Sequence, residues 1–278
     1  MSFPKSILVP TDFSSKSENA IRYACEIASY AGSYVQFLNV IEEPYDFATR
    51  AGDIVQELKT ENAEKLKKLI DDLHSTDEYR HLKLKGRVIV GKVQTTILSS
   101  AEEDKFDLIS IGLGGEADLR KVMYGSITNN ILLDSPVPVL AISKRIDFRP
   151  PQKLVFATDL RDSDLKPIRK MKKFAIEIGV ALRIVHIRDE NDKRDPSEIE
   201  LFETKIKKKL KAPHQQIEVY ESSGFVEGIT QYIGKDKHTI LVMTRYRRKF
   251  FEWLFSNSTV REIAQIAAVP LLMLPGDG

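Results

Sequence analysis

Cysteine is nearly missing from this 278-residue sequence, which has only Cys25 and five histidines. A single cysteine excludes an intrachain disulfide framework and a multi-cysteine zinc site, and the histidines form no His-x3-His pair, so we expect no structural metal. Long apolar runs are also missing. The longest, residues 266–274, has nine residues with Pro270 among them, too few to span a membrane. No signal peptide is expected either, so the sequence predicts a cytoplasmic protein.

An excess of charge of one sign is missing as well. The 42 basic and 40 acidic residues leave a formal net charge of +2, which argues against a dedicated nucleic-acid binder. The 14 glycines and 12 prolines are too few for a collagen-like or low-complexity chain, whereas 42% hydrophobic residues suffice for folded cores. We therefore expect folded domains with no nucleic-acid partner and no membrane partner.

The sequence contains an internal repeat. Residues 5–12 match residues 152–159 at an offset of 147, and a Val-Pro pair near the end of each copy repeats at an offset of 132. Two copies of one domain are therefore predicted. Their bounds are residues 1–146 and 151–276.

Each copy alternates short β-rich runs with helical patterns. The expected strands are residues 6–9, 34–41, 85–90, 108–111 and 137–142 in the first copy and 154–157, 182–185, 217–220, 240–243 and 271–273 in the second. The first helix has Ser15 and Ser17 as candidate N-cap residues and Gly32 as its end. This alternation predicts an α/β protein with two tandem doubly wound domains, each with a five-stranded parallel sheet flanked by helices.

Polar residues follow the first expected strand, where open α/β sheets bind ligands beyond the carboxyl ends of their strands. These residues are Thr11 and Asp12, preceded by Pro10. The carboxylate of Asp12 could accept a hydrogen bond from a ribose hydroxyl or an adenine amine. It could equally belong to the N-terminal cap region of the first helix, and the sequence leaves both interpretations open.

A glycine-rich segment follows the fourth expected strand. It has the pattern Gly-x2-Gly-x9-Gly-Ser, formed by Gly112, Gly115, Gly125 and Ser126, and a helical pattern follows it. Glycines let a phosphate approach the backbone closely, and a helix N-terminus offers unpaired N–H groups. The pattern therefore favours a phosphate site, with a tight turn as the alternative.

These motifs, together with Ser-Pro-Val-Pro-Val-Leu from Ser135 onward, resemble the universal stress protein family. The resemblance covers essentially all of both copies, and the glycine motif is complete in the first. It implies an adenine-nucleotide α-hydrolase-like fold, and a subset of the family with this motif binds ATP. It therefore implies a stress-response regulator that binds ATP, with Mg²⁺, in the first copy and acts as a nucleotide-dependent switch.

The resemblance also implies roles for individual residues. Those implied to contact the adenosine part are Asp12 and Val40. Those implied to hold the ribose and phosphates are Gly112, Gly115, Gly125 and Ser126. Those implied to line the rest of the pocket are Pro10, Thr11, Ile111, Gly114, Ile127 and Thr128.

The second copy departs from the glycine pattern. At an offset of 132, its three glycine positions hold Thr244, Arg247 and Asn257, and only the serine is kept, as Ser258. A β-carbon at each position should obstruct close backbone approach, so we expect no ATP site in this copy.

Residues 244–255 of the second copy place four basic side chains beside an aromatic cluster. They could pack within their own core, dock a protein partner or bind an anion through side-chain charge. The docking interpretation gives the alternative function, a nucleotide-independent interaction scaffold. The basic run at residues 205–211 is expected to be the exposed face of a helix or a surface for an acidic partner, and His186 a hydrogen-bonded strand-end residue without a catalytic role.

The sequence has neither a Gly-x-Ser-x-Gly elbow nor a Walker motif, so we expect a binding protein rather than an enzyme and assign no catalytic or metal-ligating residue. Slow ATP hydrolysis and self-phosphorylation stay open, as does a Mg²⁺ contact from Glu116 or Asp118. Family members pair their last strands, so residues 137–142 and 271–274 are expected to form an intramolecular pseudo-dimer. A further homodimer and an unknown protein partner are left open.

Overall fold

The computed structural model describes residues 4–42, 51–113, 127–143, 146–190, 192, 194–234, 236–245 and 269–276. The chain divides into two compact units. The first unit contains the described residues up to 143, and the second unit contains those from 146 onward.

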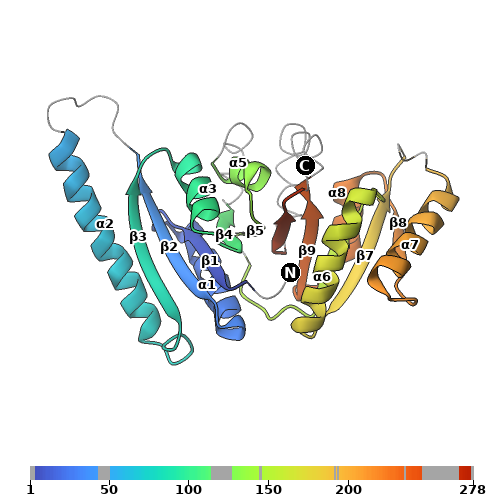
Figure 1. Ribbon diagram of the computed structural model, residues 1–278, viewed down its shortest axis with the longest axis horizontal. Coiled ribbons are helices and arrows are strands. Elements are labelled where there is room, and N and C mark those ends of the chain that lie inside the picture. The colour runs from blue at the N-terminus through green and yellow to red at the C-terminus, as the bar shows by residue number, and fades with distance from the viewer. Residues whose placement is uncertain are drawn as a thin grey trace. The chain divides into compact units, whose positions relative to one another are not determined.

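The first unit is a parallel sheet with helices between its strands (Figure 1). Its elements are β1 (Ser6–Pro10), α1 (Ser15–Ala31), β2 (Tyr34–Ile41), α2 (Ala51–His74), β3 (Lys83–Val90), α3 (Val93–Glu103), β4 (Leu108–Leu113), α5 (Ile127–Asp134) and β5 (Val139–Ser143). The strand order is β3-β2-β1-β4-β5, and every pair in it is parallel.

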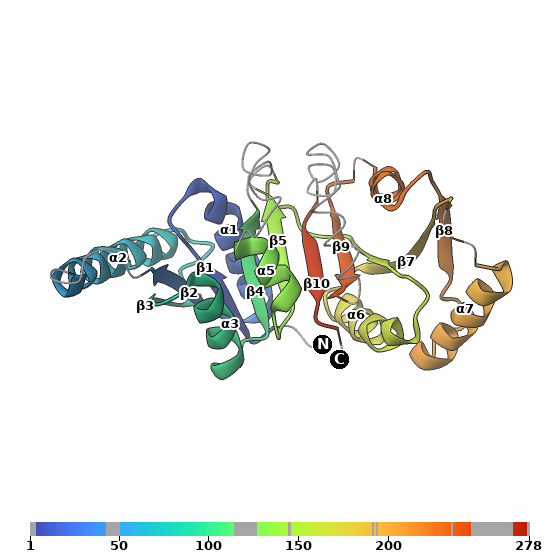
Figure 2. The ribbon, with the colours of Figure 1, turned by 90° about the horizontal axis from the view of Figure 1, so that it is seen from above.

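The second unit repeats this topology. Its elements are β6 (Lys153–Ala157), η1 (Asp162–Asp164), α6 (Leu165–Glu177), β7 (Ala181–Arg188), α7 (Pro196–Leu210), β8 (Ile217–Glu221), α8 (Phe225–Ile233), β9 (Thr239–Thr244) and β10 (Leu271–Leu274). The strand order is β10-β9-β6-β7-β8, again parallel throughout. Figure 2 shows α6 and α7 on one face of this sheet and α8 on the other. The predicted fold class, an α/β chain with parallel sheets flanked by helices, is therefore confirmed.

The central strands account for the short, continuous apolar runs in the sequence. β1 and β6 lie in the middle of their sheets and are covered on both faces, and their apolar residues are fully buried, among them Ile7, Leu8, Leu154 and Val155. Every expected strand is present, and its ends lie within about three residues of the predicted ends.

The ends of the first helix are partly as predicted. Gly32 ends α1 in the left-handed conformation, with φ of 66°. The N-cap residue is Ser14, without a side-chain capping bond, so the prediction of Ser15 or Ser17 as N-cap was wrong. The hydroxyl of Ser17 instead donates to the backbone oxygen of Ser14, one turn back along the chain.

In the described part of the chain, no helix is long and apolar enough to cross a membrane.

Candidate functional site

The strand order of the first unit reverses between β1 and β4. The chain leaves β1 toward β2 and β3 on one side of the sheet, and the later strands β4 and β5 lie on the other side. In sheets of this kind, ligands bind in a crevice beyond the carboxyl ends of the two strands at such a reversal. Thr11 and Asp12 follow β1 at this edge, and Gly112 is the penultimate residue of β4.

A strained turn presents Asp12 at the rim of the crevice. Phe13 has a φ of 61°, in the left-handed region that non-glycine residues rarely adopt, and its N–H donates to Thr11 Oγ1 at 3.0 Å. Asp12 is exposed, and its Oδ1 accepts from the N–H of Ser14 at 3.0 Å and from its hydroxyl at 2.6 Å. No described residue hydrogen-bonds to Asp12 Oδ2. One carboxylate oxygen thus anchors the turn, and the other remains for an external donor.

Buried polar groups fix the floor beneath this turn. Ser17 directs its proton to Ser14, so in the 3.0 Å contact between the two hydroxyls Thr11 is the donor and Ser17 the acceptor. The backbone oxygen of Thr11 accepts from Asn39 Nδ2 at 2.9 Å, and Asn39 Oδ1 accepts from Asn62 Nδ2 at 2.9 Å. Because Thr11 and Asn39 are buried, these bonds hold the carboxyl ends of β1 and β2 in one arrangement.

Gly112 is required by the packing of the first unit itself. A β-carbon at this position would lie 1.9 Å from the backbone oxygen of Lys16 and 2.7 Å from its backbone carbon. The first turn of α1 therefore rests directly on β4. The sequence suggested room for a phosphate at this glycine, whereas the structure shows that neighbouring backbone occupies the position of the missing side chain.

The remaining predicted site residues are distributed along the same edge and beyond it. Pro10 and Ile111 are buried, Val40 and Thr128 are half-buried, and Ile127 at the start of α5 is 41% exposed. Other predicted residues lie outside the described part of the chain; these are Gly114, Gly115, Gly125, Ser126, Glu116 and Asp118. Among the described residues, no group of three or more His, Cys, Asp and Glu side chains could hold a metal ion.

Comparison with known proteins identifies the family. The sequence profile of the universal stress protein family matches residues 4–143, half of the chain. The chain belongs to the universal stress protein family. A universal stress protein of Methanocaldococcus jannaschii is 28% identical over 155 aligned positions, and the match covers 51% of this chain and 96% of the relative.

Two further relatives extend over both units. A universal stress protein of Synechocystis is 25% identical over 288 aligned residues, covering 96% of this chain and 99% of the relative. The crystal structure of a universal stress protein from Archaeoglobus fulgidus covers 99% of this chain and 98% of its own, with a TM-score of 0.70 and 18% identity. At that identity the structural likeness shows the fold alone.

The second unit of this universal stress protein joins the corresponding strand ends through its own side chains. Asp164 is 2% exposed, and its Oδ2 accepts from the Thr158 hydroxyl at 2.7 Å and from the N–H of Asp159 at 3.2 Å. Its Oδ1 accepts from the hydroxyl of Thr244, at the end of β9, at 3.0 Å. The carboxyl ends of β6 and β9 are thereby tied together through one buried carboxylate.

The two crevices differ by a paired replacement. At the repeat offsets, Asp164 corresponds to Ser17 and Thr244 to Gly112. In the second unit the first helical turn is the 3₁₀ turn η1, so the backbone is locally different from the start of α1. The hydrogen-bonded pair of Asp164 and Thr244 thus takes the place of Ser17 and Gly112, which lie against each other in the first unit.

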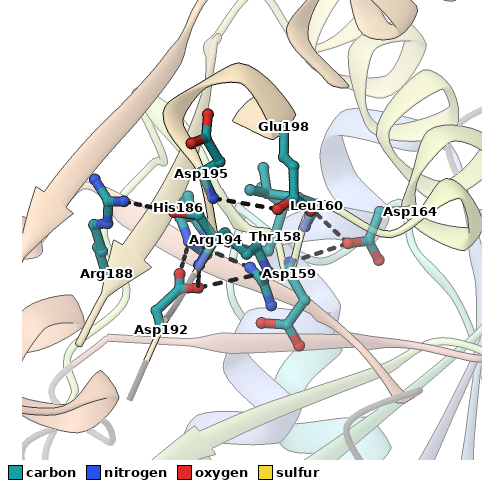
Figure 3. A network of polar contacts seen from close by, with 10 residues as sticks. All are labelled: Thr158, Asp159, Leu160, Asp164, His186, Arg188, Asp192, Arg194, Asp195 and Glu198. Carbon is teal, nitrogen blue, oxygen red and sulfur yellow. Dashed lines mark hydrogen bonds and ion pairs between the residues drawn. The ribbon is translucent and has the colours of Figure 1, made fainter. Parts of the chain in front are cut away.

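A second buried network surrounds His186 near the end of β7 (Figure 3). Its Nδ1 lies 3.0 Å from the backbone oxygen of Thr158, and its Nε2 lies 2.6 Å from Asp192 Oδ2. Arg194 Nη1 also lies 3.3 Å from Nε2, so the carboxylate and the guanidinium both contact this ring nitrogen. Burial favours the protonated acid, yet the hydrogen bonds from His186 and from the backbone of Arg194 lower the pKa of Asp192.

His186 therefore performs the role of Asn39 in the first unit, where an amide donates to the corresponding threonine carbonyl. The predicted hydrogen-bonded strand-end residue is confirmed. Sequence reasoning missed Asp164 and Asp192. The repeat alignment contained a signal for Asp164, because an acid stands where the first copy has Ser17. Arg247, Asn257, Ser258 and the rest of residues 246–268 lie outside the described part.

Proposed function

We propose that this universal stress protein is an ATP-binding stress-response regulator with one nucleotide site, at the crevice of the first unit. Occupancy by ATP is proposed to order the glycine-rich segment that follows β4 and so to change the adjacent surface, as in other ligand switches. The second unit is proposed to have no nucleotide site, so only the first unit would respond to ATP.

The observation that carries this proposal is the exposure and hydrogen bonding of the Asp12 carboxylate. Its carboxylate lies at the strand-order reversal, exposed and anchored through Oδ1, and Oδ2 has no partner among the described residues. A fixed acceptor at this place suits a ribose hydroxyl or an adenine amine. In the second unit, Asp164, at the position that corresponds to Ser17, ties the strand ends together.

In this proposal, different residues of the chain contact the nucleoside and the phosphates. Asp12 accepts from the nucleoside, and half-buried Val40, at the end of β2, offers apolar contact. The sequence Gly-x2-Gly-x9-Gly-Ser leads from β4 to the N-terminus of α5, which begins at Ile127. Backbone N–H groups of glycines and of a helix start are suited to phosphate oxygens. Mg²⁺ bound with the nucleotide supplies neutralisation of phosphate charge.

Calorimetric titration of the nucleotide-stripped chain with Mg-ATP tests the proposal, with one site per chain as the expected stoichiometry. The Asp12→Asn variant keeps an oxygen for Ser14 but loses the charged acceptor, so affinity should fall about 10- to 100-fold, as for a lost hydrogen bond to a charged group. The matched variant Asp159→Asn, in the second unit, should bind like wild type.

A further variant copies the second repeat into the first. Gly115→Arg introduces the residue found at the corresponding position, Arg247, and should abolish ATP binding while leaving the circular dichroism spectrum unchanged. Two sites per chain would overturn the assignment of the second unit as unable to bind. No saturable binding would favour the nucleotide-independent scaffold that uses residues 244–255.

A further inference from the structure

Basic side chains are concentrated on one helical face of the second unit. Helices α6 and α7 pack against each other on the same face of the sheet (Figure 2). Helix α6 has one acidic residue, Glu177, and five basic ones, which are Lys166, Arg169, Lys170, Lys172 and Lys173. Helix α1 occupies the same position in the first unit with two basic and two acidic residues. The charge is therefore a feature of the second unit and not of the shared fold.

Part of this charge faces a groove of about 880 Å³ between the two helices. The charged side chains that line it are Lys166 and Arg169 of α6, Lys205, Lys208 and Lys209 of α7, and Asp162 of η1. Five positive charges and one negative charge leave the lining with a net charge of +4. Five cations around one hollow repel each other, and a bound anion would relieve that repulsion.

The one acid in the lining neutralises a single cation. Asp162 Oδ1 lies 2.7 Å from Lys205 Nζ, and the Asp162 side chain is 70% exposed. In the described part of the chain, Arg169, Lys208 and Lys209 have no carboxylate within ion-pair distance. Three cations thus face the groove without an internal counter-charge, one of them a guanidinium that can bond two phosphate oxygens at once.

We propose that this groove binds a compact, multiply charged phosphate compound, such as a short polyphosphate chain or a small molecule with several phosphate groups. The hollow has a limited volume and its cations come from two sides, which suits a compact anion. A long polyanion needs an extended basic surface, and the whole chain has a net charge of only +2. This site is separate from the nucleotide crevice and does not depend on it.

Inorganic tripolyphosphate titrated into the full chain at about 150 mM salt is the direct test. Replacing Arg169 and Lys208 together with glutamine should weaken binding at least tenfold. The matched control, with Lys170 and Lys173 replaced by glutamine, removes the same charge from exposed residues outside the groove lining and should change affinity less than twofold. Orthophosphate should bind at least tenfold more weakly than tripolyphosphate.

Three outcomes would overturn the proposal. Equal losses in the two variants would show diffuse electrostatic attraction, and tighter binding of duplex DNA through Arg169 and Lys208 would make the groove a nucleic-acid surface. Binding that survives replacement of Arg169 and Lys208 but disappears in Gly115→Arg would belong to the nucleotide crevice. Conversely, tripolyphosphate binding that is retained in Gly115→Arg supports the groove even if ATP binding fails.

Discussion

Replacing Thr244 with valine should destabilise the second unit, because it removes one of three donors to a buried carboxylate. Valine keeps the size of the side chain, and only the hydroxyl that bonds to Asp164 Oδ1 at 3.0 Å is lost. Asp164 is 2% exposed, so water cannot readily replace the missing donor. A hydrogen bond to a charged group contributes about 1.5–3 kcal/mol, and we expect the free energy of unfolding to fall by that amount.

Urea unfolding followed by tryptophan fluorescence measures this change. The chain has one tryptophan, Trp253, which belongs by sequence to the second repeat and reports that repeat. With a urea dependence of about 2 kcal/mol per M, the midpoint should move down by roughly 1 M. Circular dichroism reports the helices of both units, so comparing its transition with the fluorescence transition shows whether the two units unfold together.

The matched control is Thr230→Val in α8 of the same unit. Thr230 Oγ1 is buried and has no hydrogen-bond partner among the described residues, so its removal should leave stability unchanged or slightly higher. The reasoning is refuted if Thr244→Val is as stable as wild type, or if the two variants lose equal stability.

Three further predictions concern other buried groups. Gly112→Ala should destabilise the first unit by about 1–3 kcal/mol in urea unfolding, because its β-carbon would lie 1.9 Å from the backbone oxygen of Lys16. Asp192→Asn should lower stability at neutral pH, with the difference from wild type shrinking as the pH falls below about 4 and lost once it passes the lowered pKa, since His186 helps to hold the pKa of Asp192 below its unfolded value. Burial raises the pKa of Cys25 to about 12, so a thiol reagent at pH 8 should react at least about 100-fold more slowly before unfolding than after.

Each of these has its own control. Gly224→Ala adds a β-carbon with no atom within 4 Å and should be nearly neutral, so an equal loss from Gly112→Ala would argue against the clash. A pH-independent effect of Asp192→Asn would mean that its charge contributes nothing. Rapid labelling of native Cys25 would show that the core around it opens easily, although its side chain is fully buried.

Much of the fold could be predicted from the sequence because its signals are local. The apolar runs of β1 and β6 and the glycines that end their following helices, Gly32 and Gly179, recur at the same spacing in both copies. The place of the candidate site follows from topology alone, which puts the carboxyl ends of β1 and β4 side by side. Asp12 was selected for that reason.

The contacts that distinguish the two crevices could not be predicted, because they join residues far apart in the chain. Asp164 and Thr244 are 80 residues apart in the chain. From the sequence, Thr244 is recognisable only as a β-carbon at a glycine position, and no motif links it to Asp164. The packing of α1 on Gly112 could not be predicted either, because nothing in the sequence shows that contact. The groove of the second unit could not be predicted either, because it forms only where α6 packs against α7, and the sequence shows the basic run of α7 alone.

The left-handed turn beside Asp12 has a counterpart in the second unit, where Leu160 has a φ of 59° and its N–H donates to Thr158 Oγ1 at 3.0 Å. Each turn costs roughly 1–2 kcal/mol, and that strain is incurred when the unit folds, before any ligand arrives. The backbone beside Asp12 is therefore preorganised, and a ligand would lose little entropy in ordering it. Phe13→Gly would relax the turn and free it to move, so stability and ligand affinity would change in opposite directions at this one residue.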